Sequence, residues 1–133
     1  MKGGKKTVKK AMVFLMMIVM IVTSSSVSFA ADTQLLKGTS SGQSFAQRWQ
    51  APILYSSDRH SWLIYGYDTT LIHEDYAYAD SIGYIHRSKL VNGKGTFSGP
   101  KKAATDGRSD LEITHKLRTD GQAIAYYCMK TSF

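Results

Sequence analysis

The chain has 133 residues, with 17 basic and ten acidic side chains and a formal net charge of +7. Five of the lysines stand in residues 1–30, which hold no acidic residue, so residues 31–133 carry a net charge of only +2. That balance excludes an argument for nucleic-acid binding from overall charge. The only cysteine is Cys128, which excludes an internal disulfide and a cysteine zinc motif.

Residues 1–30 have the pattern of a secretory signal peptide. Five lysines precede an unbroken apolar run over 11–22, and a short polar segment then leads to the small residues Ser28 and Ala30. A helix that spans a bilayer needs about 20 apolar residues, so a retained membrane anchor is the less favoured alternative. We predict cleavage after Ala30 and a secreted, extracellular protein.

The remaining hundred or so residues are enough for one domain with its own core. Residues 31–48 are rich in glycine, serine and threonine, which predicts a flexible N-terminal arm. Tyrosine, isoleucine and threonine dominate later, so we expect a β domain over 49–133. A single helical turn is the most that 44–50 or 101–110 could form.

Strand candidates follow in chain order at 53–55, 62–67, 71–78 and 81–91. The last of these alternates, with His86, Ser88 and Leu90 on one face and Arg87 and Lys89 on the other. The pair 92–93, Asn-Gly, is a hairpin turn signal, so we expect 81–91 to pair with 94–98.

The clearest alternation lies near the C-terminus, over 111–118. Asp120 and Gly121 could form a type I′ turn, which would pair 111–118 with 123–130 and place Ile113 opposite Cys128. Cys128 would then face the core as an inert thiol. The alternative is a thiol that pairs between chains and gives a homodimer.

Short strands joined by hairpin turns predict an all-β fold. The predicted architecture is a small antiparallel β-sandwich built from hairpins, and a small barrel is the alternative.

No residues form a convincing active site. The segment 58–61, Asp-Arg-His-Ser, holds the residue types of a hydrolase triad, but adjacent residues cannot converge on one reacting atom, so a turn is favoured. The segment 73–75, His-Glu-Asp, lacks a second ligand pair for a metal, and surface polarity explains it more simply. Glu74 and Asp75 point to opposite faces of a strand, unlike the carboxylate pair of a glycosidase. We therefore expect a binding protein that is not an enzyme and has no cofactor or metal.

Aromatic and basic residues favour a binding role. Both tryptophans and all eight tyrosines lie after residue 30, and charge is uneven, with net −3 over 31–83 and net +5 over 84–133. Cations beside aromatic rings suit phosphates and sugars. The alternative is that the tyrosines cover a sheet and the charges form an ordinary solvated surface. The basic cluster is Arg87, Lys89, Lys94, Lys101 and Lys102.

Several short motifs stand in a fixed order. The segment 84–89 has the form Tyr-x-His-x-Ser-Lys, and other motifs flank it: Trp62 with Tyr65-Gly66, then Val91-Asn92-Gly93, then Gly99 with Lys101-Lys102-Ala103, and finally Tyr126-Tyr127. Over residues 62–128 this order resembles the lactococcin 972 family of bacteriocins. The chain departs from the family in lacking a Ser-Ala pair after the motif lysine and a tryptophan near the Lys-Ala segment, and in having Cys128.

The resemblance implies a small secreted β-sandwich that acts without catalysis, by binding the cell-wall precursor lipid II and blocking septum formation. It also implies a membrane immunity protein and an ATP-binding transporter as partners in the producing cell. We expect no nucleic-acid partner. A non-toxic module that binds the cell wall or other cells is the alternative function, and a small secreted enzyme or enzyme inhibitor is a third. The expected ligand-binding residues are Tyr84, His86, Arg87, Lys89, Lys101 and Lys102.

Overall fold

Nine β-strands and no helix make up the part of the chain that the computed structural model describes, residues 31–133. The all-β prediction is confirmed, and the helical turns considered for 44–50 and 101–110 do not form. The predicted signal peptide, 1–30, lies outside the described residues. Within 31–133, no helix is long and apolar enough to cross a membrane. The strands are β1 (Thr33–Thr39), β2 (Trp49–Gln50), β3 (Leu54–Tyr55), β4 (Ser61–Asp68), β5 (Glu74–Ser81), β6 (His86–Asn92), β7 (Gly95–Ser98), β8 (Ser109–Thr114) and β9 (Ala125–Lys130).

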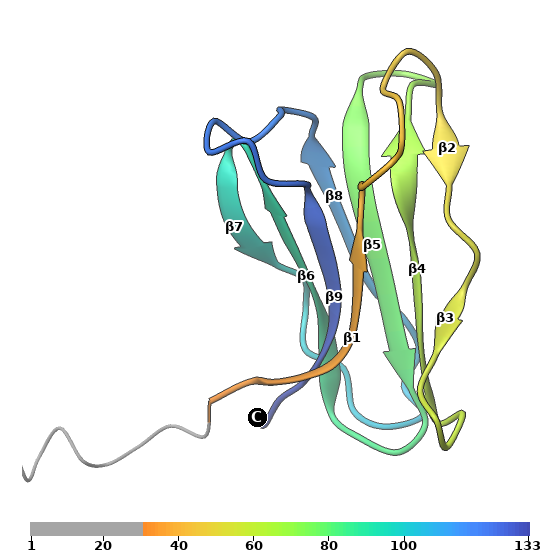
Figure 1. The fold of residues 1–133 in the computed structure, drawn as a ribbon. Helices are drawn as coiled ribbons and strands as arrows, with labels where there is room; N and C mark the ends of the chain where they lie inside the picture. Colours follow the sequence, from red (N-terminus) through yellow and green to blue (C-terminus); the bar gives the residue numbers. More distant parts are fainter. Residues whose placement is uncertain (1–30) are drawn as a thin grey trace, which may run out of the picture. The chain divides into compact units, whose positions relative to one another are not determined.

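The strands form two antiparallel sheets that face one another (Figure 1). The four-stranded sheet has the order β1-β9-β6-β7, and the five-stranded sheet has the order β2-β4-β5-β8, with β3 also paired to β4. The chain changes sheet after β1, β5, β7 and β8. Segments far apart in the sequence therefore become neighbours, and Thr33–Thr39 pairs with the last strand.

Alternation along the strands directs one side chain in two into the space between the sheets. Leu63 and Ala77 from the five-stranded sheet meet Leu90, Tyr126 and Cys128 from the four-stranded sheet, and all five side chains are buried. Full burial of a large apolar side chain contributes about 1.5–3 kcal/mol. The inward orientation that the sequence predicts for Cys128 is confirmed.

One end of this interior is polar. Ser61 Oγ donates to Ser81 Oγ at 2.9 Å, which links β4 to β5. Ser88 Oγ and Ser109 Oγ are 3.1 Å apart and connect β6 to β8 across the two sheets. All four serines are fully buried, so these hydrogen bonds satisfy hydroxyl groups that would otherwise oppose burial.

The hairpin between β6 and β7 forms as predicted, with Asn92 paired to Gly95. Its turn approaches the segment after β8, where the Gly93 amide donates to the Lys116 carbonyl at 2.7 Å. A Cβ atom on Gly93 would lie 1.9 Å from the Leu117 carbonyl oxygen. Glycine is therefore required here for the close approach of two backbone segments.

The sequence predicts a flexible arm over 31–48, and this prediction is wrong because the segment contains β1. In β1, Lys37 pairs with Tyr127 of β9, and a bulge between Gln34 and Leu36 interrupts the register. Leu35 and Leu36 pack against the core. The polar composition of the segment conceals a strand whose stability comes from backbone pairing at the sheet edge and from two leucines.

The hairpin expected between 111–118 and 123–130 is also wrong. β8 pairs with β5, whereas β9 lies between β1 and β6 in the other sheet. A type I′ turn needs positive φ at both central residues, but only Gly121 has one, at 74°. Asp120 Oδ1 instead accepts from the Gln122 amide at 2.9 Å, which is an Asx turn within a connection between the sheets.

Candidate functional site

The outer face of the four-stranded sheet carries a row of cationic and aromatic side chains. Tyr127 of β9 is paired in register with Lys37 of β1 on one side and with Lys89 of β6 on the other. The Nζ atoms of Lys37 and Lys89 lie 5.6 and 5.0 Å from the centre of the Tyr127 ring. We call these three residues the lysine–tyrosine row.

Both lysines of the row keep their charge available. Neither forms an ion pair with any residue in the described part of the chain. A cation over an aromatic face gains about 0.5–1 kcal/mol at an exposed site, which holds the two ammonium groups near the same ring. Each ammonium has three donors for an anion bound beside Tyr127.

Arg87 stands beside the row on the same outer face of β6, but its charge is paired. Its Nε donates to Asp32 Oδ2 at 2.6 Å, and Thr131 Oγ1 donates to Asp32 Oδ1 at 2.7 Å. Burial alone would raise the pKa of Asp32, but the hydrogen bonds from Thr131 and Arg87 outweigh it and lower that pKa below its usual value. Arg87 therefore fastens the start of β1 to β6.

Three other expected site residues are engaged near the end of the chain. Lys130 Nζ lies 4.5 Å from the centre of the Tyr84 ring. Lys101 Nζ donates to the Ser132 carbonyl at 2.8 Å. Lys102 pairs through its backbone with the first residue of β6, in two hydrogen bonds of 2.9 Å. These contacts do not unite the six expected residues in one cluster.

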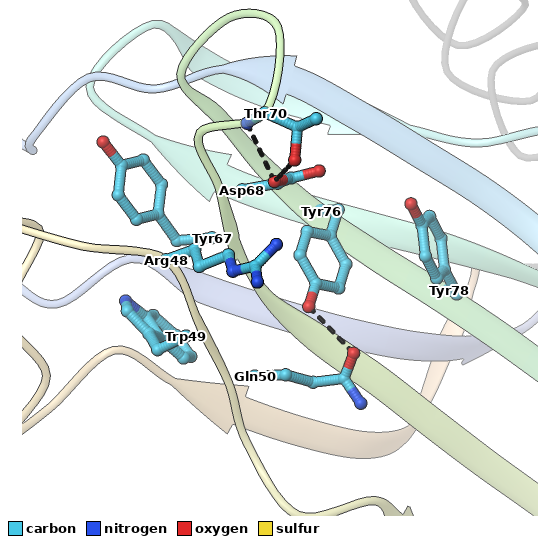
Figure 2. A pocket seen from close by; sticks show the side chains of 8 residues that line it. All are labelled: Arg48, Trp49, Gln50, Tyr67, Asp68, Thr70, Tyr76 and Tyr78. Carbon is cyan, nitrogen blue, oxygen red and sulfur yellow. Dashed lines mark hydrogen bonds between the residues drawn. The ribbon is translucent and has the colours of Figure 1, made fainter.

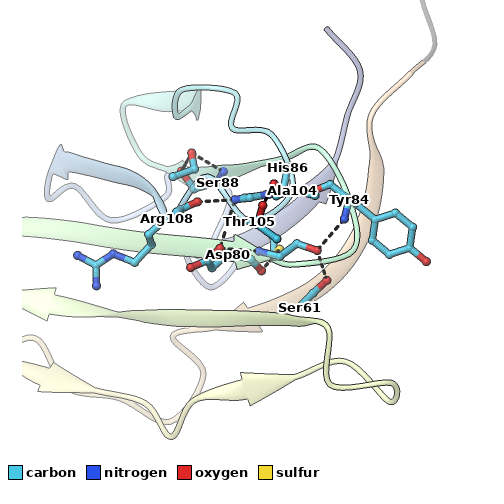
Figure 3. A network of polar contacts seen from close by, with 12 residues as sticks. Ser61, Asp80, Tyr84, His86, Ser88, Ala104, Thr105 and Arg108 are labelled. Carbon is cyan, nitrogen blue, oxygen red and sulfur yellow. Dashed lines mark hydrogen bonds and ion pairs between the residues drawn. The ribbon is translucent and has the colours of Figure 1, made fainter.

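His86 was expected to bind a ligand, but its side chain is fully buried. Figure 3 shows the polar contacts of its ring. Its Nδ1 contacts the Tyr84 carbonyl at 2.9 Å, and its Nε2 contacts the Gly107 carbonyl at 2.8 Å. Asp80 Oδ1 lies 3.5 Å from Nε2. Through these two contacts the ring joins the β5–β6 connection to the loop that contains Gly107. It cannot reach an external ligand in this fold.

Two members of the row were missed from the sequence. Lys37 lies in the segment expected to be a flexible arm, where the bulge after Gln34 breaks the period-two pattern of β1. Tyr127 belongs to a Tyr-Tyr pair in which Tyr126 is buried and Tyr127 is half-buried, so alternation in β9 could have assigned Tyr127 to the outer face.

The segments considered for catalysis have structural roles. Asp58 Oδ1 accepts from Ser56 Oγ at 2.6 Å and from the His60 amide at 3.0 Å, which confirms a turn at Asp58 that leads into β4 at Ser61. The segment 73–75 was expected to lie on a polar surface, and this is wrong for Asp75. Its side chain is fully buried and accepts from His115 Nδ1 at 2.8 Å.

Within residues 31–133, no three His, Cys, Asp or Glu side chains are grouped to hold a metal ion. No family model, curated protein or solved structure matches this chain. The lysine–tyrosine row is therefore the principal guide to the function proposed below.

Proposed function

We propose that the protein is a secreted, non-catalytic antimicrobial of the lactococcin 972 type, which binds an anionic cell-wall precursor such as lipid II. The observation that carries this proposal is the placement of Lys37 and Lys89 over one tyrosine ring on an open sheet face. The ordered motifs from Trp62 to Tyr127 and the signal-like segment 1–30 support it.

The pyrophosphate of such a precursor offers several acceptor oxygens to two ammonium groups. Charge-assisted hydrogen bonds to phosphate are about twice as strong as neutral ones. An anionic membrane surface also attracts lysines, by about 1 kcal/mol for each residue near the surface. In this proposal the cleaved signal peptide exports a β-sandwich, and a membrane immunity protein and a transporter serve the producing cell.

A growth assay tests the function. Purified residues 31–133 should inhibit related bacteria, and added lipid II should relieve the inhibition. The double variant Lys37→Gln/Lys89→Gln should lose most of this inhibition. The control Lys94→Gln/Lys116→Gln removes the same charge from two exposed lysines outside the row and should retain it.

Two results would reject the proposal. No inhibition across a broad panel of bacteria would exclude an antimicrobial role. Co-sedimentation with purified peptidoglycan in the absence of any killing would instead identify the alternative, a wall-binding or adhesive module.

A further inference from the structure

A second surface feature lies on the other sheet, beside β2 and the end of β4. It is an open cavity of about 490 Å³ (Figure 2). Its lining includes four polar side chains and two tyrosines: Arg48, Gln50, Asp68, Thr70, Tyr76 and Tyr78. The cavity falls within the range of about 300–1,000 Å³ that is typical of small-molecule sites.

The aromatic wall of this cavity is built by alternation along β5. Tyr76 and Tyr78 project outward, and their ring centres are 4.9 Å apart with the planes inclined by 26°. Gly66 of β4 pairs with Tyr76, and a Cβ atom there would lie 2.6 Å from the Tyr76 hydroxyl oxygen. The missing side chain lets the Tyr76 ring lie across β4, where its hydroxyl donates to Gln50 Oε1 at 3.0 Å.

The polar groups present both donors and acceptors. Arg48 is exposed, and its side chain forms no hydrogen bond or ion pair with residues 31–133. Figure 2 shows its guanidinium directed toward Tyr76. Asp68 Oδ1 accepts from the Thr70 hydroxyl at 2.7 Å and the Thr70 amide at 3.0 Å. These bonds lower the pKa of Asp68, which keeps it ionised at neutral pH. Because Gln50 Oε1 accepts from Tyr76, the two amide protons of Gln50 remain to donate.

The charges of Arg48 and Asp68 balance, so the site favours neither an anion nor a cation. A ligand that suits it is neutral and has several hydroxyl groups that both donate and accept, to pair with Arg48, Gln50 and Asp68. We propose that this cavity binds a sugar unit of a neutral oligosaccharide. The site lies on a different sheet from the lysine–tyrosine row, so it is an additional binding function that does not depend on the proposed one.

Tryptophan fluorescence offers a local readout. The chain has two tryptophans, and Trp49 borders the cavity. In residues 31–133 with the substitution Trp62→Phe, Trp49 is therefore the only tryptophan, and the fluorescence reports on the cavity. Maltotriose, cellotriose and triacetylchitotriose are the probes, each titrated to about 10 mM, which reaches weak single-site binding. At least one should change the fluorescence in a saturable way.

Matched variants locate the binding. Arg48→Ala should raise the dissociation constant at least about tenfold, because a charge-assisted hydrogen bond is lost. Arg59→Asn is the control, because Arg59 is an exposed arginine outside the cavity, where it lies over Tyr55, and asparagine tolerates its φ of 59°. The control should bind as the parent does.

The proposal is overturned if none of the three trisaccharides produces a saturable change. It is also overturned if Arg48→Ala and Arg59→Asn weaken binding equally. Circular dichroism and thermal unfolding check that both variants are folded, and Arg48→Lys, which keeps the exposed charge, provides a second variant with an intermediate expected affinity. Failure here leaves the growth assay unaffected, because that assay depends on Lys37 and Lys89.

Discussion

The side chains of His86 and Asp75 are fully buried, and both have polar partners. His86 contacts two carbonyl oxygens, and Asp75 accepts from His115 at 2.8 Å and from Asn92 at 3.0 Å. Removing one partner of a buried polar pair leaves the other without a hydrogen bond, which costs more than the bond itself contributes. These residues therefore hold the fold rather than a ligand.

Replacement of His86 measures this structural role. His86→Ala should lower the free energy of unfolding by about 2–4 kcal/mol, because it leaves a cavity where a fully buried ring stood and removes the contacts of that ring with two carbonyl groups. Urea unfolding followed by circular dichroism gives this value. His60→Ala is the control, since the His60 side chain is 54% exposed, and it should change stability by less than about 0.5 kcal/mol. Similar losses in the two variants would contradict the account.

Cys128 should be unreactive in the folded protein. Its side chain is fully buried, and this desolvation raises the pKa of Cys128 to about 12. Only the thiolate attacks a disulfide reagent, and at pH 8 about one thiol in ten thousand would be ionised. Ellman's reagent should therefore react quickly in urea and very slowly in buffer. Fast reaction in buffer, or a disulfide-linked dimer on a non-reducing gel, would contradict the burial of this thiol.

At the scale of elements, the attachment of β1 decides whether the lysine–tyrosine row exists, because β1 supplies Lys37. The strand is fixed by pairing with β9, by its leucines and by Asp32, which bonds to Arg87 of β6 and to Thr131 after β9. The described fold therefore joins the two ends of residues 31–133.

The Asp32 contacts predict a dependence of stability on pH. The pKa of Asp32 is lower in the folded state than its ordinary value of 3.8, so its contribution is complete above that value and is lost as the pH falls through the folded pKa. Asp32→Asn should reduce stability by about 1 kcal/mol at pH 7, as expected for a partly buried ion pair. Urea unfolding at pH 7 and at a series of values below pH 3.8 should show that the difference from the parent shrinks as the pH falls. A difference that persists unchanged over this series would refute this explanation.

The sequence predicts on which face of a sheet a side chain lies better than it predicts which strands pair with one another. Alternation correctly places His86, Ser88 and Leu90 on one face of β6, and the structure shows that this face is buried. Pairing of β8 with β5 was not predictable from Asp120 and Gly121, because the same dipeptide also supports an Asx turn between sheets. Lys89 belonged to the expected site, but its neighbours Lys37 and Tyr127 depend on pairing between strands distant in the chain.

At the scale of the whole described fold, the two sheets have different outer faces. The four-stranded sheet presents the lysine–tyrosine row, and the five-stranded sheet presents the neutral cavity beside Tyr76 and Tyr78. The basic excess of residues 84–133 supplies Lys89, but Lys37 comes from the acidic part of the chain. Charge along the sequence therefore indicates the kind of partner, while strand pairing determines where that partner would bind.

Binding to lipid II tests the central claim most directly. Neutral phosphatidylcholine vesicles with and without lipid II are mixed with residues 31–133, and bound protein is measured by sedimentation. We expect binding that requires lipid II and that Lys37→Gln/Lys89→Gln weakens at least about tenfold, which corresponds to about 1.4 kcal/mol. The control Lys94→Gln/Lys116→Gln should change it less than about twofold. Equal weakening by the two pairs, or no effect of removing Lys37 and Lys89, would contradict the claim that this row is the binding site.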